Sequence, residues 1–468
     1  MAPLAIRLDG TLSPIEALSR FSDLPGLCLL HSAAANHPLS RFSFLAADPV
    51  ASIGAHADRW PEIRDQIRAT LSSKTDILPN LPPFQGGWMG WFSYELGTAF
   101  DDVIRHPNQP LPIPDVALGL YDWVIAWDHE RGDTWLISTG VDATGQRDAG
   151  RAQSRRDVIF ARWRGGEAVV SAGRTYAAAV ASGGQPNPRP ATRPTHADFT
   201  PAAYQTAVAR VVEYVLAGDI FQANLAQRFT VPFAGDAVTL YREITARSSA
   251  PMAAFVRHAD ISVVSASPEQ FIRLDAATGN VETRPIKGTR PRAVDTAHDA
   301  AFARELQASE KDRAENVMIV DLLRNDLSRV CRPGTVRVPV LCALESHPTV
   351  HHLVSTVIGE LDPAHDALDL IAATFPGGSI SGAPKLRAMA IIRELEPVAR
   401  GVYSGAIGWI GLDGSMDTSI AIRTVAIAAG IASLHAGGGI TARSVPADEY
   451  QETLDKARAL LDAVAATA

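Results

Sequence analysis

Residues 308–326 read ASEKDRAENVMIVDLLRND and predict the core of a long helix, which we place at about 302–329. Asp312 and Glu315 lie three residues apart in this helix. At that spacing both carboxylates project from the same helical face. This pairing is the starting point for both the fold and the site.

A second helix, predicted at about 446–465, also carries acidic residues at helical spacing, namely Glu449 and Glu452, with Lys456 one turn further on. Two such helices could converge on one hard cation, since Mg²⁺ often takes one or two protein carboxylates and completes its shell with water and substrate oxygens. From spacing alone, however, solvated acidic surfaces are the more common explanation.

Strand-like segments surround these helices without any regular strand–helix alternation. We therefore predict an α+β fold with sizeable mixed or antiparallel sheets flanked by helices. The expected strands include 121–127, 134–138, 261–265, 271–274, 335–340 and 425–434, and another helix is expected at 383–395.

The clearest break in the chain is SGGQPNPRPATRPTH at residues 182–196, which is rich in proline and predicts a linker loop. Directly after it, Thr200 can cap a helix that Gly218 would end. We therefore divide the chain into an N-terminal half at 1–181, the linker loop, and a catalytic region at 197–468. We expect the two halves to pack closely.

The 468 residues carry a net charge of −8 and only three cysteines, Cys28, Cys331 and Cys342. No basic cluster favours nucleic acid or a membrane surface as partner. No cysteine pair suggests zinc, and no signal peptide or membrane-spanning run is evident. The composition therefore predicts a cytoplasmic protein.

Two glycine-rich stretches could present backbone N–H groups to an anion: FPGGSISGAPK at 375–385 and Gly437 to Gly439. Taken alone, each is more often a tight turn. Together with Arg423 and the carboxylates they favour a small substrate with several negative charges.

Lys287, in RPIKGT, and Glu269, in SPEQF, are candidates for covalent and acid chemistry. A desolvated lysine becomes a nucleophile, and a buried glutamate becomes a proton donor. The alternatives are an ion-pair lysine and a turn glutamate. At the adjacent pair His351 and His352, at most one ring can face a site, because neighbours on a strand point opposite ways.

The motifs SPEQF, RPIKGT, KDRAENVMIVDLLRND, HHLVS, FPGGSISGAPK, DTSIAIRT, AGGGI and EYQETLDKA follow one another in this order along the chain. Together they resemble the chorismate-utilising enzymes, a family that includes anthranilate, aminodeoxychorismate, isochorismate and salicylate synthases. The resemblance covers roughly residues 200–460 and extends into the N-terminal half. In the N-terminal half it is carried by HSAAANHPLSRF and PFQGGWMGWFSYELG.

The resemblance implies the α+β architecture of that family, with one large β-sandwich-like core of mixed or antiparallel sheets and helices outside, and a role for each matching residue. It implies that Mg²⁺ is held by Glu315 and Glu452, with Asp312 and Glu449 close by, and that Glu269 protonates the departing C4 hydroxyl of chorismate. The implied substrate-binding residues are Gln222, His352, Ser381, Tyr403, Arg423, Gly438 and Gly439, to which we add Lys456.

Two positions discriminate within the family. Lys287 stands where the anthranilate-, isochorismate- and salicylate-forming members usually carry alanine, and Gln222 where the water-using members carry a lysine base. The resemblance thus implies synthesis of 4-amino-4-deoxychorismate from chorismate and ammonia, through a covalent lysine intermediate, towards 4-aminobenzoate and folate. No cysteine lies in a glutaminase-like nucleophile turn, so a separate glutamine amidotransferase subunit is implied as the ammonia source.

The resemblance also implies a tryptophan-shaped pocket, but His31 replaces the glutamate of the tryptophan-regulated members. A bound tryptophan, an empty pocket and weak feedback therefore stay open. The pocket residues are Ser32, Leu39, Ser40, Arg41, Phe42, Pro251, Met252 and Ala253.

Two alternatives are kept. The first is an anthranilate synthase component I, which would introduce nitrogen at C2 of chorismate. The second is a non-catalytic subunit that binds tryptophan, against which the intact Glu269, Lys287, Glu315 and Glu452 argue.

Overall fold

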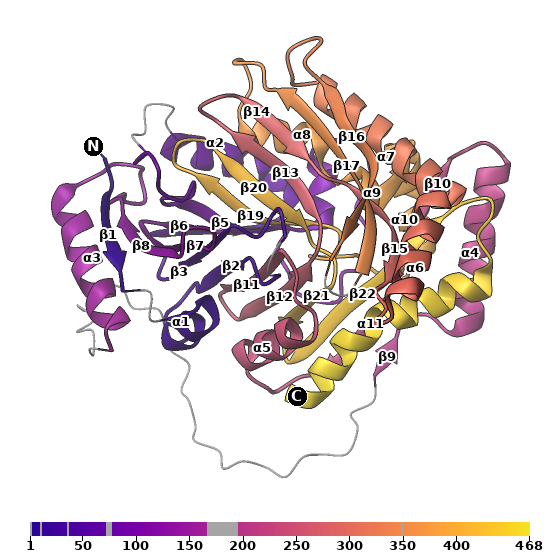
Figure 1. Cartoon of the computed structure of the whole chain (residues 1–468), viewed down its shortest axis with the longest axis horizontal. Helices are drawn as coiled ribbons and strands as arrows, with labels where there is room; N and C mark the ends of the chain where they lie inside the picture. The colour runs from indigo at the N-terminus through magenta and orange to yellow at the C-terminus, as the bar shows by residue number, and fades with distance from the viewer. Residues whose placement is uncertain (1, 10–11, 35–36, 72–76, 166–194, 348–349) are drawn as a thin grey trace.

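The structure is a computed structural model that describes residues 2–9, 12–34, 37–71, 77–165, 195–347 and 350–468. Two large antiparallel sheets form its centre and helices lie on the outside (Figure 1). This confirms the predicted α+β fold. Among the described helices, none combines the length and the apolar character needed to cross a membrane.

The first sheet mixes strands from both sides of residues 166–194. Its strand order is β1 (Leu4–Leu8), β8 (Asp133–Ser138), β7 (Trp123–Asp128), β3 (Phe42–Ala46), β2 (Cys28–His31), β11 (Met252–His258), β12 (Ile261–Ser267), β21 (Thr424–Ala428), β22 (Ile431–Ile440), β10 (Gln222–Pro232) and β18 (Gly382–Ala383), and β9 (His196–Ala197) also pairs with β10.

The second sheet is mixed in the same way. Its order is β15 (Ile286–Pro291), β17 (Val350–Glu360), β14 (Asn280–Thr283), β13 (Gln270–Asp275), β20 (Met416–Ile420), β19 (Ala406–Gly411), β5 (Gly87–Phe92), β6 (Val116–Tyr121) and β4 (Ala51–Ala55), and β16 (Arg337–Ser346) also pairs with β17.

The helices cover the outer faces of this sandwich. They are α1 (Pro14–Arg20), α2 (Trp60–Thr70), α3 (Ala149–Trp163), α4 (Pro201–Leu216), α5 (Ala237–Arg247), α6 (Thr296–Ala308), α7 (Glu310–Ser328), α8 (Ala367–Thr374), α9 (Gly378–Ser381), α10 (Lys385–Leu395) and α11 (Pro446–Thr467), with short 3₁₀ turns at Ala57–Arg59 and Tyr94–Ala99.

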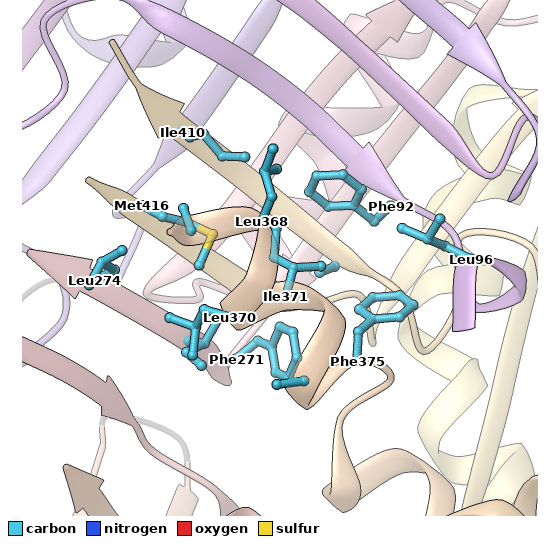
Figure 2. Packing of buried hydrophobic residues seen from close by; sticks show 14 of the residues in the cluster. Phe92, Leu96, Phe271, Leu274, Leu368, Leu370, Ile371, Phe375, Ile410 and Met416 are labelled. Atoms are coloured by element: carbon cyan, nitrogen blue, oxygen red, sulfur yellow. The ribbon is translucent and has the colours of Figure 1, made fainter. Parts of the chain in front are cut away.

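The core lies in three layers. Between the sheets, Phe44 and Val263 of the first sheet pack with Met89 and Trp409 of the second. Outside the second sheet, α8 lays Leu368 and its neighbours on β13, β19 and β20, as Figure 2 shows. Helices α1, α3, α5 and α11 bury their apolar faces on the first sheet. Burial of this apolar area supplies most of the stabilisation.

Two predicted elements are wrong in detail. The helix expected at about 302–329 is two helices, α6 and α7, because Ser309 ends the first and its hydroxyl accepts a hydrogen bond from the N–H of Asp312 in the second (3.3 Å). The strand expected at 425–434 is a hairpin, because Ala429 and Gly430 both have positive φ, as a two-residue turn requires.

Two other predictions on the sequence have clear outcomes. The helix after the break is confirmed, and the Thr200 hydroxyl accepts from the N–H of Ala203 at its start. The predicted linker loop falls almost wholly outside the described residues, and its last residue, His196, begins β9. The division into 1–181, 182–196 and 197–468 stays a prediction.

Candidate active site

A cavity of about 550 Å³ lies where the ends of β15 and β22 meet helices α7 and α11. It brings together most of the predicted site residues from distant parts of the sequence. Those that line it are Glu269, Lys287, Asp312, Glu315, His352, Tyr403, Arg423, Gly438, Gly439, Glu449, Glu452 and Lys456.

Lys287 reaches the cavity from a distorted part of β15. The pairing of β15 with β17 shifts register between Lys287 and Thr289, and the residue between them, Gly288, has a φ of +77°. A Cβ at Gly288 would lie 2.9 Å from the Asp312 side chain, so glycine is required for this close approach to α7. The Lys287 Nζ donates to the carbonyl of Ser379 (3.0 Å).

Burial and charge act on Lys287 and Glu269 in complementary ways. Burial lowers the pKa of Lys287, although Glu315 and Glu269 oppose the change. Burial raises the pKa of Glu269 to about 7, against the stabilising effect of a Ser379 hydrogen bond and of Lys287. The cavity therefore favours a neutral amine and a protonated acid compared with water.

Four carboxylates from α7 and α11 form one wall. Burial raises the pKa of Glu315 and of Glu449. Burial also acts to raise the pKa of Glu452, but Lys456, whose Nζ lies 2.5 Å from Glu452 Oε1, together with Lys311 and Lys287 outweighs burial, and the pKa is lowered. At Gly438, an added Cβ would lie 3.3 Å from Glu449 Oε2, so the bare backbone lets these carboxylates approach.

This wall fits a hard cation. Glu315 Oε1 is buried and has no hydrogen-bond partner, which leaves a carboxylate oxygen available as a ligand. Within the described residues, the only group of three or more His, Cys, Asp or Glu residues whose ligand atoms all lie within 4.8 Å of one another is His37, Glu345 and His347, which do not line this cavity. The four carboxylates are thus spread along the wall, as suits an ion that completes its shell with water and substrate oxygens.

Other lining residues of the cavity offer donors to an anion. Arg423 is partly buried, and its φ of +52° is a strained backbone conformation that holds its guanidinium at the cavity. Tyr403 stacks on His435 with 5.1 Å between ring centroids. His352 shares a hydrogen bond with the Thr289 hydroxyl (3.0 Å), and burial lowers the pKa of His352 to about 4, so the ring is neutral. The neighbouring His351 instead bonds to Ser346 and Asp299, away from the cavity.

Two predicted substrate-binding residues do not line the cavity. The Ser381 hydroxyl is buried and donates to the carbonyl of Gly377 (2.8 Å). Gln222 lies directly behind Gly439: a Cβ on that glycine would be 2.0 Å from Gln222 Nε2. Neither amide atom of Gln222 has a hydrogen-bond partner.

Sequence reasoning missed several lining residues, namely Asn224, Thr289, Lys311, Ser379 and His435. Lys311 was detectable, because it precedes Glu315 by one helical turn, and its Nζ lies 3.7 Å from Glu449. Ser379 lies inside the quoted glycine-rich stretch, but only the folded chain shows which of its serines faces the cavity.

A second cavity, of about 830 Å³, lies between the two sheets near β2 and β11. All eight residues predicted for a tryptophan-shaped pocket line it, as does His31. Burial lowers the pKa of His31 to about 4, and its Nδ1 lies 2.9 Å from the Tyr241 hydroxyl. His31 is therefore neutral, and a carboxylate at this position would carry a charge that this imidazole does not.

Comparison with known proteins gives consistent matches. The family model for chorismate binding enzymes matches residues 27–462. The chain is 39% identical over 460 residues to aminodeoxychorismate synthase component 1 of Escherichia coli K12, which covers 95% of this chain and 94% of that protein. It is 39% identical over 466 residues to anthranilate synthase component 1 of Streptomyces coelicolor, covering 98% and 87%.

Among solved structures, anthranilate synthase component I of Streptococcus pneumoniae superposes with a TM-score of 0.77 at 29% identity. The match covers 97% of this chain and 99% of the other. The sandwich described above is therefore the fold of those enzymes.

Proposed function

The chain belongs to the family of chorismate-binding enzymes, and on that premise we propose that it converts chorismate and ammonia into 4-amino-4-deoxychorismate. That it is an enzyme acting on chorismate follows from the family. The choice of product depends chiefly on one observation: the amine of Lys287 lies partly buried in the cavity, has a lowered pKa and donates a hydrogen bond to the Ser379 carbonyl.

In the first proposed step, the neutral amine of Lys287 forms a bond to C2 of the chorismate ring. The two conjugated ring double bonds shift, from C1=C2 and C5=C6 to C1=C6 and C4=C5, and the C4–O bond breaks, while Glu269 donates a proton so that the oxygen leaves as water. Glu269 suits this role because its pKa of about 7 keeps a large fraction protonated near neutral pH.

In the second proposed step, ammonia forms a bond to C4, the two double bonds return to C1=C2 and C5=C6, and the C2–N bond breaks to release the Lys287 amine. The surplus proton of ammonia returns to the Glu269 carboxylate, so the enzyme ends as it began and one water is produced. Two successive displacements put nitrogen at C4, whereas a single displacement at C2 would lead towards anthranilate.

Substrate orientation is assigned to two sets of lining residues, the donors and the carboxylates. Arg423 and Tyr403 bind the carboxylate groups of chorismate, and His352, which is neutral, lines the ring. Glu315 and Glu452, with Asp312 and Glu449 beside them, would hold Mg²⁺, which supplies charge neutralisation and orientation for a substrate carboxylate when bound. Glu315 Oε1, buried without a hydrogen-bond partner, supports this assignment.

Ammonia is proposed to come from a separate glutamine amidotransferase subunit. The described cysteines support this: all three are buried, and burial raises the pKa of Cys28 and Cys331, the reverse of an activated thiolate. The relatives named "component 1" also suggest a second component.

The test is product analysis. The purified chain, given chorismate, Mg²⁺ and an ammonium salt at alkaline pH, should form 4-amino-4-deoxychorismate, identified by chromatography and mass spectrometry. Glutamine alone should not support turnover. Anthranilate or isochorismate as the main product would overturn the proposal.

A further inference from the structure

Three exposed apolar residues lie on the elements that meet around the start of β10, the strand whose first residue lies behind the active-site cavity, and we call this set the patch. It consists of Leu216, Phe221 and Leu386, whose exposed fractions are 73%, 69% and 46%. Among the large hydrophobic side chains that are exposed in the described chain, Phe221 is the one aromatic residue. Exposed aromatic residues beside aliphatic ones are typical of protein–protein contact sites.

The patch is built on a fixed framework. Leu216 ends α4, Phe221 immediately precedes β10, and Leu386 lies in the first turn of α10. Arg387 of α10 forms an ion pair with Asp219 in the intervening turn (2.8 Å), and its guanidinium lies 5.1 Å from the centre of the Tyr214 ring. The N–H of Phe221 donates to the carbonyl of Ala383 (2.7 Å). The three apolar side chains therefore project from elements that are tied together.

The residue after Phe221 connects this surface to the active site. Gln222 is only 1% exposed, both of its amide atoms lack partners, and its side chain contacts Gly439, which lines the cavity. A buried amide without partners is costly, so a polar molecule that hydrogen-bonds to it would be stabilised there. Ammonia can both donate to Gln222 Oε1 and accept from Nε2.

From this continuity we propose that the patch of Leu216, Phe221 and Leu386 docks the subunit that produces ammonia, and that ammonia passes Gln222 on its way to the cavity. The inference rests on the proposed function. Ammonia released into bulk water at neutral pH becomes ammonium, which has no lone pair to attack C4. A partner seated beside Gln222 would deliver it unprotonated over a short path.

The test separates docking from chemistry. Phe221→Asp and Leu216→Asp are assayed with the glutamine amidotransferase subunit from the same source plus glutamine, at a partner concentration below saturation, and separately with an ammonium salt. We expect a loss of about tenfold or more in apparent partner affinity, the size of an aromatic contact at an interface centre, and ammonium-dependent turnover within about twofold of wild type.

Val158→Asp is the matched control. Val158 is an exposed aliphatic residue on α3, which packs on β1 and β8 at the opposite edge of the same sheet from β10 and β18 (Figure 1). It should leave both activities unchanged.

Unchanged partner affinity in both patch variants would overturn the docking site. So would an equal loss of glutamine- and ammonium-dependent turnover in a folded variant, or a wild-type homodimer on gel filtration that Phe221→Asp converts to monomer. If wild type itself forms no 4-amino-4-deoxychorismate from ammonium, it is the proposed function that fails.

Discussion

The proposed chemistry needs Lys287 to be neutral and Glu269 to be protonated, and desolvation favours both of these states. Desolvation disfavours any charged form, so the same buried cavity lowers the pKa of an amine and raises that of a carboxyl group. Their mutual attraction opposes this, because each stabilises the charge on the other. Ser379 contributes at both residues, since its carbonyl accepts from Lys287 and its side chain bonds to Glu269.

The raised pKa of Glu269 makes stability depend on pH. Below the ordinary value of 4.5, the carboxyl is neutral in the folded and unfolded chains alike, and burial costs little. As the pH rises towards about 7, only the unfolded chain ionises freely, so the folded state loses stability. Relative to Glu269→Gln, wild type should lose up to about 3 kcal/mol of unfolding free energy between these pH values.

Urea unfolding of both proteins at several pH values measures this difference. A constant gap across the range would mean that the Glu269 carboxyl is not desolvated in the folded chain.

Helices α7 and α11 contribute as a pair, since neither alone supplies the carboxylate wall. Their spacing could be predicted from sequence, because i, i+3 positions share a helical face. The break at Ser309 was also readable, because a serine three residues before Asp312 is a local capping signal. The turn at Ala429 was not, because alanine seldom adopts a positive φ. The sequence of 375–385 also could not show which of its serines faces the cavity. In the folded chain Ser379 lines the cavity, whereas the Ser381 hydroxyl donates to the Gly377 carbonyl.

At the scale of these helices, Glu315→Gln and Glu452→Gln should abolish turnover at ordinary Mg²⁺, because an amide is a weaker ligand for a hard cation than a carboxylate. Circular dichroism should show an unchanged fold. Asp321→Asn on α7 and Asp455→Asn on α11 are matched controls, since both carboxylates are largely exposed and pair only locally within their own helices. Near-normal turnover in either glutamate variant would remove that residue from the proposed ligand set.

At the scale of the whole molecule, the two sheets each combine strands from both ends of the chain. The active-site cavity and the second cavity are therefore built on the same two sheets. The motifs predicted which residues gather, but not that Gln222 would lie behind Gly439, since strand pairing between β10 and β22 creates that contact. The α+β class was predictable from scattered strands and helices, while the strand order depends on long-range pairing that no local pattern encodes.

The second cavity leads to a prediction about regulation. With neutral His31 in place of the glutamate of tryptophan-regulated members, we expect tryptophan to inhibit weakly or not at all. Turnover is measured against tryptophan concentration, with calorimetry to detect binding independently. Strong inhibition at micromolar tryptophan would show that feedback does not need that glutamate.

The central claim is that Lys287 attacks chorismate, and trapping the adduct tests it most directly. Enzyme incubated with chorismate and Mg²⁺ but no ammonia should carry a covalent adduct on the peptide containing Lys287, seen by mass spectrometry, with a yield that rises with pH as the amine becomes neutral. Lys287→Ala and Lys287→Arg should both lack the adduct and most of the rate. Alanine has no amine, and the guanidinium of arginine stays protonated and cannot attack. No adduct on wild type, together with full ammonia-dependent synthesis of the same product by Lys287→Ala, would contradict the account.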